Sequence, residues 1–95
     1  MMDNNSIVLK FDKSIPNLAG YEYGVSIYEE QIKGKLDFSK KFEIEFPDYI
    51  EMIASSFVQG LFSDIVNQIG LANTESRLTI KAGTQDIAEA IKRKL

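Results

Sequence analysis

The stretch EMIASSFVQGLFSDIVNQIG, residues 51–70, carries the clearest secondary-structure signal in this chain of 95 residues. Its apolar residues recur at helical spacing and form one broad stripe, which predicts an amphipathic helix. Gly70 marks the predicted end of this helix, because glycine readily adopts the positive φ found after many helices. The residues of the stripe are Phe57, Val58, Leu61, Phe62, Ile65, Val66 and Ile69.

Two serines, Ser55 and Ser56, precede the stripe. Ser56 and Gln59 have the spacing of a capping box, in which the serine oxygen accepts a backbone N–H and the glutamine reaches back to the cap. The short apolar segment 49–53 predicts a strand that delivers the serines to the helix. Gly60, inside the helix, predicts close packing against a sheet.

Outward from this stretch, strand and helix patterns alternate along the chain. Period-2 alternation predicts strands over residues 7–11, 42–46 and 78–81, and residues 12–17 read as a loop. Helical spacing predicts one helix from about residue 18 to Gly34 and another after Thr84. This order, strand and helix three times over, predicts an α/β fold with a mainly parallel sheet.

The three predicted strands are apolar on one side only. Charged and polar residues fill their alternate positions, although both sides would be apolar if helices covered both faces. We therefore expect helices on one face of the sheet and a polar, solvated second face. The alternate residues are Lys10, Glu43, Glu45, Thr79 and Lys81.

Two features of the first predicted helix concern its packing. Tyr21 and Tyr28 share its apolar stripe, which predicts that both are buried in the core. Gly20 and Gly24 lie four residues apart on one face, which predicts close approach to a neighbouring element.

The composition and charge of the chain limit the kinds of function that it can have. The chain is 44% hydrophobic and 26% charged, as expected for one soluble domain over residues 1–95. Its net charge of -3 argues against nucleic acid as a partner. The start of the chain lacks a basic region followed by an apolar stretch, and no apolar run is long enough for a bilayer, which predicts a cytoplasmic protein that does not bind membranes.

The residue inventory argues against an enzyme. The chain has no cysteine and no histidine, so imidazole and thiol chemistry and zinc ligation by these residues are excluded. It also lacks a phosphate-binding loop and a serine-nucleophile motif. We expect no catalytic residue, no metal site and no cofactor.

Residues 54–57, Ala-Ser-Ser-Phe, resemble the Asp-Ser-Ser-Gly motif of the STAS fold, named for sulfate transporters and anti-sigma-factor antagonists. In the antagonists, the first serine of that motif is phosphorylated by an ATP-binding kinase. Ala54 and Phe57 depart from the motif, so phosphorylation does not carry over directly. A closer resemblance is to bacterial STAS-like domains of unknown function, in which an apolar strand and a serine-rich turn lead to Ser-Phe at a helix start, as in residues 53–62 here.

The resemblance implies a non-catalytic, protein-binding regulatory domain in a partner-switching or signalling system. The implied partner is a histidine-kinase-like ATPase, and Ser55 or Ser56 is the candidate phosphorylation switch. The simpler alternative is structural, with Ser56 as an N-cap and Ser55 as a turn residue. The predicted partner-binding residues are Ala54, Ser55, Ser56, Gln59, Tyr49 and Glu51.

Two other functions fit the sequence. One is a small acidic inhibitory or structural protein, encoded by a phage or mobile element, that acts through Glu43 and Glu45 on the charged sheet face. The other is a domain that binds a small anionic ligand near the start of the main helix.

Overall fold

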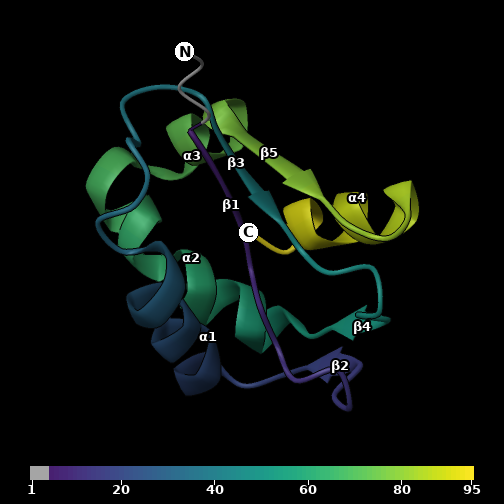
Figure 1. Ribbon diagram of the computed structural model, residues 1–95. Coiled ribbons are helices and arrows are strands. Elements are labelled where there is room, and N and C mark those ends of the chain that lie inside the picture. Colours follow the sequence, from purple (N-terminus) through teal and green to yellow (C-terminus); the bar gives the residue numbers. More distant parts are fainter. Residues whose placement is uncertain (1–4) are drawn as a thin grey trace.

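A computed structural model of the protein describes residues 5–95 (Figure 1). Its main sheet consists of β1 (Ser6–Val8), β3 (Phe42–Glu45) and β5 (Leu78–Lys81), all parallel and in the order β1-β3-β5. Ile44 at the centre of β3 lies opposite Ile7 of β1 and Ile80 of β5. The three predicted parallel strands are therefore confirmed, although β1 ends at Val8, before the end of the alternating segment 7–11.

Residues 5–95 also contain four α-helices, which lie between or after these strands along the chain: α1 (Tyr21–Ile27), α2 (Ser55–Ile69), α3 (Leu71–Arg77) and α4 (Gln85–Arg93). Helix α1 continues as a π-helical segment, η1 (Tyr28–Ile32), in which the Lys33 N–H donates to the Tyr28 carbonyl (2.8 Å). Gly34 then adopts a positive φ of 77° and ends the helix as predicted. None of these helices is long and apolar enough to cross a membrane.

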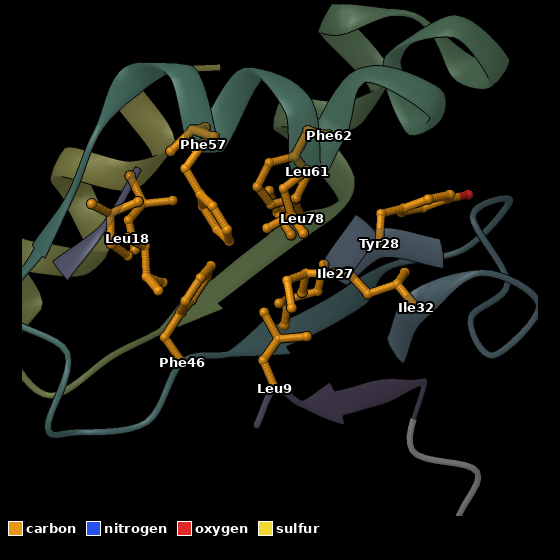
Figure 2. Close-up of a cluster of buried hydrophobic side chains, with 14 of the residues drawn as sticks. Leu9, Leu18, Ile27, Tyr28, Ile32, Phe46, Phe57, Leu61, Phe62 and Leu78 are labelled. Atoms are coloured by element: carbon orange, nitrogen blue, oxygen red, sulfur yellow. The ribbon is translucent and has the colours of Figure 1, made fainter. Parts of the chain in front are cut away.

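The core lies between the helices and one face of the main sheet. Figure 2 shows Phe57, Leu61 and Phe62 of α2 pointing toward Leu9 and Phe46. On the opposite face, Thr79 and Lys81 are exposed and Glu43 and Glu45 are half-buried. The prediction of helices on one face is confirmed. The fully buried large side chains are Leu9, Leu18, Ile32, Phe42, Ile44, Phe46, Ile50, Phe57, Leu61, Phe62, Ile65 and Leu78.

A second sheet contains only two short strands, β2 (Asn17–Leu18) and β4 (Met52–Ile53), which are parallel. The N–H of Ala54 donates to the Leu18 carbonyl (2.8 Å), so this sheet fixes the chain immediately before α2. The predicted strand over 49–53 is thus confirmed only at its end, and the loop predicted to reach Asn17 ends one residue earlier. Strands of two residues are too short to produce a periodic pattern.

The outer edges of the main sheet are partly covered by side chains. Along a parallel strand, successive residues direct their backbone groups to alternate sides. At the β1 edge, the Gln31 amide accepts from the Lys10 N–H (2.7 Å) and donates to the Lys10 carbonyl (2.8 Å). At the β5 edge, Lys92 of α4 donates to the Leu78 carbonyl (2.7 Å).

Helices α1 and α2 approach so closely that glycine is required on both. A Cβ added to Gly60 would lie 2.0 Å from the Tyr21 carbonyl oxygen, and one added to Gly24 would lie 2.3 Å from that of Phe57. The predicted close approach at Gly24 is confirmed, whereas the prediction that Gly60 packs against a sheet is wrong. The predicted burial of Tyr21 is also wrong: its backbone rests on α2 and its side chain is 51% exposed.

Helix α3 was not predicted from the sequence. Gly70 has a positive φ of 85° and ends α2 as expected, but the chain becomes helical again at the next residue. Residues 71–77 carry no apolar stripe that would indicate a helix. The turn is held by Thr74, whose buried hydroxyl donates to the Gly70 carbonyl (2.8 Å).

Candidate functional site

The first turn of α2 is the candidate site, and it lacks a side-chain cap. Ala54, in an extended conformation, precedes the helix, and its carbonyl accepts from the N–H groups of Phe57 (3.1 Å) and Val58 (3.2 Å). The helix therefore begins at Ser55, two residues earlier than a cap at Ser56 requires. The predicted capping box is wrong.

Ser56 and Gln59 instead make contacts with other segments. The Ser56 hydroxyl accepts from the N–H of Gly20 (3.0 Å), the residue before α1. The Gln59 side chain donates to the Lys94 carbonyl (2.5 Å), after α4. Ser56 thus fastens the loop between β2 and α1 to α2, and Gln59 fastens α2 to the end of α4.

Ser55 differs from Ser56 because its side chain is exposed and makes no hydrogen bond within residues 5–95. The N–H groups of Ser55 and Ser56 likewise donate to no group in that part of the chain. Free N–H groups and the helix dipole favour negative charge at such a helix start. An anionic group on the Ser55 oxygen would therefore meet a favourable electrostatic environment.

Two large apolar side chains are exposed in segments that adjoin the serine pair. Met52 of β4 is 67% exposed and lies three residues before Ser55. Tyr21 is 51% exposed and directly follows Gly20, to which Ser56 is bonded. They are two of the five large apolar side chains that are exposed in residues 5–95. Tyrosine and methionine side chains are enriched at protein-binding surfaces.

Two hollows accompany these side chains. One, of about 320 Å³, is lined by Tyr21 and Gln59 together with apolar residues of α2. The other, of about 140 Å³, lies between Met52 and the last turns of α4, including Ala90, and Lys94 just after that helix. Each hollow is lined by a residue close to the serine pair in the chain, Gln59 in the first and Ile53 in the second.

An aromatic cluster packs against the buried side of the first turn of α2. The Phe57 ring packs edge-on against Tyr23 (centroids 5.4 Å apart) and Phe11 (6.1 Å). Burial raises the pKa of Tyr23, with smaller contributions from nearby acidic groups and Tyr49. The Tyr49 hydroxyl donates to the Phe11 carbonyl (2.5 Å). These contacts fix the direction in which α2 starts.

The structure brings most of the predicted partner-binding residues together. Ser55, Ser56, Gln59 and Glu51 are exposed around the first turn of α2, and Ala54 is half-buried beside them. Tyr49 is half-buried, with its hydroxyl directed to Phe11.

Sequence reasoning missed Met52 and Tyr21 as members of this surface. Met52 lies in a strand too short to show which of its sides is buried. Tyr21 shares the spacing of the buried helical positions, so its pattern indicated the core.

A polar cluster joins η1 to the second half of α2, beyond the first turn of that helix. The Tyr28 hydroxyl donates to Asp64 (2.5 Å), which also accepts from Gln68 (2.8 Å). Burial, then the hydrogen bond to Asp64, raises the pKa of Tyr28 well above its ordinary value. Tyr28 is 4% exposed, as predicted for a core residue. Among residues 5–95, no three or more Asp, Glu, His or Cys side chains are grouped to hold a metal ion.

Comparison with known proteins agrees with the fold and with the resemblance at the serine pair. The family model described as STAS-like domain of unknown function (DUF4325) matches residues 23–88, which include most of α1, the core strands β3 and β5, and the first turn of α2. No curated protein and no solved structure matches the chain significantly. The parallel sheet with four α-helices is consistent with a STAS-like fold. The chain belongs to the family of STAS-like domains of unknown function.

Proposed function

We propose that this chain is a non-catalytic regulatory domain that binds a protein partner through the first turn of α2. The observation that carries the proposal is Ser55, whose exposed hydroxyl makes no hydrogen bond within residues 5–95 and lies at the start of a helix. The segments joined to this helix start expose two large apolar side chains, Met52 and Tyr21. A purely structural serine would be expected to bond to the backbone, as Ser56 does to Gly20.

Phosphorylation of Ser55 is the proposed switch. A phosphoserine carries a charge of about -2 and can accept hydrogen bonds from free N–H groups at a helix start. The same charge disfavours an apolar contact with a partner, because it would lose its hydration there. One modification would therefore stabilise the first turn and release a partner that covers Met52 and Tyr21.

The proposed partner is a histidine-kinase-like ATPase, inferred from the resemblance to anti-sigma-factor antagonists. Phe57 occupies the place of the glycine in their motif, and the structure gives it a different role. Its side chain is 0% exposed and belongs to the aromatic cluster. The departure from the motif thus concerns the core and leaves Ser55 on the surface.

Phosphorylation is tested by incubating the chain with ATP and a histidine-kinase-like ATPase encoded near its gene. We expect intact-mass spectrometry to show one added phosphate, and fragmentation to place it on Ser55. The Ser55→Ala variant should remain unmodified, whereas Ser56→Ala and Ser76→Ala should be modified like the unaltered chain. Ser76 is a matched control because it is an exposed helical serine in α3. Modification of Ser76 in preference to Ser55 would refute the proposal.

The binding surface is tested separately with the same ATPase and without phosphorylation. Ser55→Asp should weaken binding, and Ser76→Asp should leave it unchanged. Met52→Ser and Tyr21→Ser should weaken binding through lost apolar contact, by about tenfold or more if they are central to the interface. If Met52→Ser and Tyr21→Ser both bind the ATPase as tightly as the unaltered chain, this surface is not the one that the partner covers.

A further inference from the structure

The open face of the main sheet has a hollow of about 680 Å³ at the amino-terminal ends of the strands. It is lined by side chains of β1, β3 and β5 and of the turn that precedes β3. The proposed partner surface follows β4, outside this sheet, and shares no lining residue with the hollow. The hollow is therefore a separate feature that the proposed function does not use.

Its lining carries an excess of positive charge on a chain that is acidic as a whole. Lys40, Lys41 and Lys81 line the hollow, whereas Glu43 is its one acidic lining residue and already forms an ion pair with Lys81 (3.7 Å). The ammonium groups of Lys40 and Lys41 make no ion pair within residues 5–95. The hydroxyl of Thr79 adds a neutral polar group. This chemistry complements carboxylates.

The turn that presents the two lysines is fixed by hydrogen bonds. The Asn5 amide donates to the carbonyls of Asp37 (2.7 Å) and Lys41 (2.9 Å) and accepts from the Asp37 N–H (2.8 Å). The Asp37 carboxylate accepts from the hydroxyl of Ser39 (2.6 Å), and this bond holds the pKa of Asp37 below its ordinary value. Arg77 donates to the Phe38 carbonyl (2.9 Å). The lysines are thus presented from a preorganised backbone.

The edge of β1 next to the hollow indicates which backbone conformation a bound ligand would have. Asn5 and Leu9 bond to β3, through the N–H of Glu43 (3.0 Å) and the carbonyl of Glu45 (2.9 Å). By alternation, the backbone groups of Ser6 and Val8 face away from β3, and no partner for them lies within residues 5–95. Ser6 also lines the hollow, and Val8 is 54% exposed. Such an edge is complementary to an extended backbone.

We propose that this part of the open sheet face binds an extended, acidic protein segment, which pairs with the edge of β1 and directs carboxylates toward Lys40 and Lys41. Nucleic acid is a poorer match, because its phosphates would continue past the lysines and meet Glu43 and Glu45. A single small anion is also a poorer match, because the lysines are spread along an open hollow and no buried polar group converges on one point.

The experiment uses a blocked oligoglutamate peptide as the probe and follows the backbone amide signals of the whole chain by NMR. We expect shifts in β1, at residues 40–43 and at residues 79–81. Binding should weaken with added salt, because the Debye length falls to about 8 Å at 0.15 M. A blocked oligoglutamine peptide of equal length should bind more weakly. Equal binding of the two peptides, or shifts confined to other residues, would overturn the proposal.

Paired variants locate the charge effect. The double substitution of Lys40 and Lys41 by Gln should weaken oligoglutamate binding by about fivefold, as expected for two exposed ion pairs. The same change at Lys33 and Lys35, an exposed lysine pair that does not line the hollow, should have little effect. An equal loss in both double variants would show that the attraction is non-specific and would refute a site.

The edge is tested with Val8→Pro, which removes an N–H that faces away from β3. It should weaken oligoglutamate binding, whereas Val8→Thr, which keeps that N–H, should not. The thermal midpoint of each variant checks that it is folded. If Val8→Pro does not fold, the double substitution of Lys40 and Lys41 by Gln still tests the proposal. An oligothymidylate that binds the same residues more tightly than oligoglutamate would instead identify a nucleic-acid surface. Ser55→Asp should leave oligoglutamate binding unchanged.

Discussion

Helices α2 and α4 start in different ways. At α4, the Thr84 side chain accepts from the Ile87 N–H (3.2 Å) and caps the helix within its own sequence. At α2 no side chain does this, and Ser56 accepts instead from Gly20 in a distant segment. The start of α4 is closed by a local hydrogen bond, whereas the start of α2 depends on its contact with α1.

The difference separates a structural helix start from one that is available for function. Capping satisfies an N–H of α4 and leaves less for a ligand or a phosphate to contact. At α2, the N–H groups of Ser55 and Ser56 and the Ser55 hydroxyl remain without partners in the described residues. The start of α2 is instead attached to the first helix by the Ser56–Gly20 hydrogen bond and by the close approach of Gly60 to Tyr21.

The largest expected effect comes from breaking the α1–α2 contact. Gly60→Ala places a Cβ 2.0 Å from the Tyr21 carbonyl, and we expect a loss of about 3 kcal/mol in the free energy of unfolding, despite the better helix propensity of alanine. Urea denaturation measures it. The control is Asn67→Ala on the exposed side of α2, which should be neutral or slightly stabilising. A stabilised Gly60→Ala variant would mean that the helices are not in contact here.

Tyr28→Phe tests the other junction between the first helix and α2. Removing the hydroxyl deprives Asp64 of one donor and should lower the unfolding free energy by about 1.5 kcal/mol at neutral pH. Folding raises the pKa of Tyr28 above 10.0, so its contribution is fully present below pH 10 and is lost as the pH rises beyond it. The unaltered chain should therefore lose stability above pH 10 more steeply than the variant. Parallel pH profiles would contradict this.

Thr84→Ala removes the cap of α4 and should lower the unfolding free energy by about 1 kcal/mol. Thr84→Ser keeps the accepting oxygen and serves as the control, with most of the stability retained. The effect should be confined to α4, which amide hydrogen exchange can resolve. If α2 were destabilised equally, the two helix starts would not be independent.

Ser56→Ala should have a smaller effect, about 0.5 kcal/mol, because water can replace its exposed oxygen. Its signature is local: the Gly20 amide should exchange faster, since it loses its acceptor. Ser56→Thr, which keeps the hydroxyl, is the control. Unchanged exchange at Gly20 would show that this bond does not join the two segments in solution.

Ser55→Ala should have the smallest effect on stability, within about 0.5 kcal/mol, because the side chain is exposed and makes no hydrogen bond within residues 5–95. The same variant should lose phosphorylation by the ATPase. The two measurements together sharpen the contrast with Thr84, where substitution changes stability. A large loss of stability in Ser55→Ala would assign Ser55 a structural role instead.

The main architecture could be predicted from the sequence because its elements have clear periods. The stripe of α2 and the alternation in β3 and β5 identify both the elements and the buried face. Helix α3 and strand β2 could not be predicted in this way, since neither is long or apolar enough to show a period, and β4 was indicated only by the apolar segment 49–53.

The candidate site could be located from the sequence, but its contacts could not. The serine pair and the apolar segment before it indicated the first turn of α2, where the structure places most of the predicted residues together. The partners of Ser56 and Gln59 lie 36 and 35 residues away in the chain, so only the tertiary structure reveals them. Local capping rules therefore assigned both side chains to the nearest available role.

The Gln31 amide imitates the peptide group of a further strand at Lys10, since it both accepts and donates there as a neighbouring backbone would. It limits the open edge to the short segment around Ser6 and Val8. Fibril formation generally needs about six consecutive residues of exposed strand. Within residues 5–95, the open part of this edge is therefore shorter than the strand segments typical of fibrils.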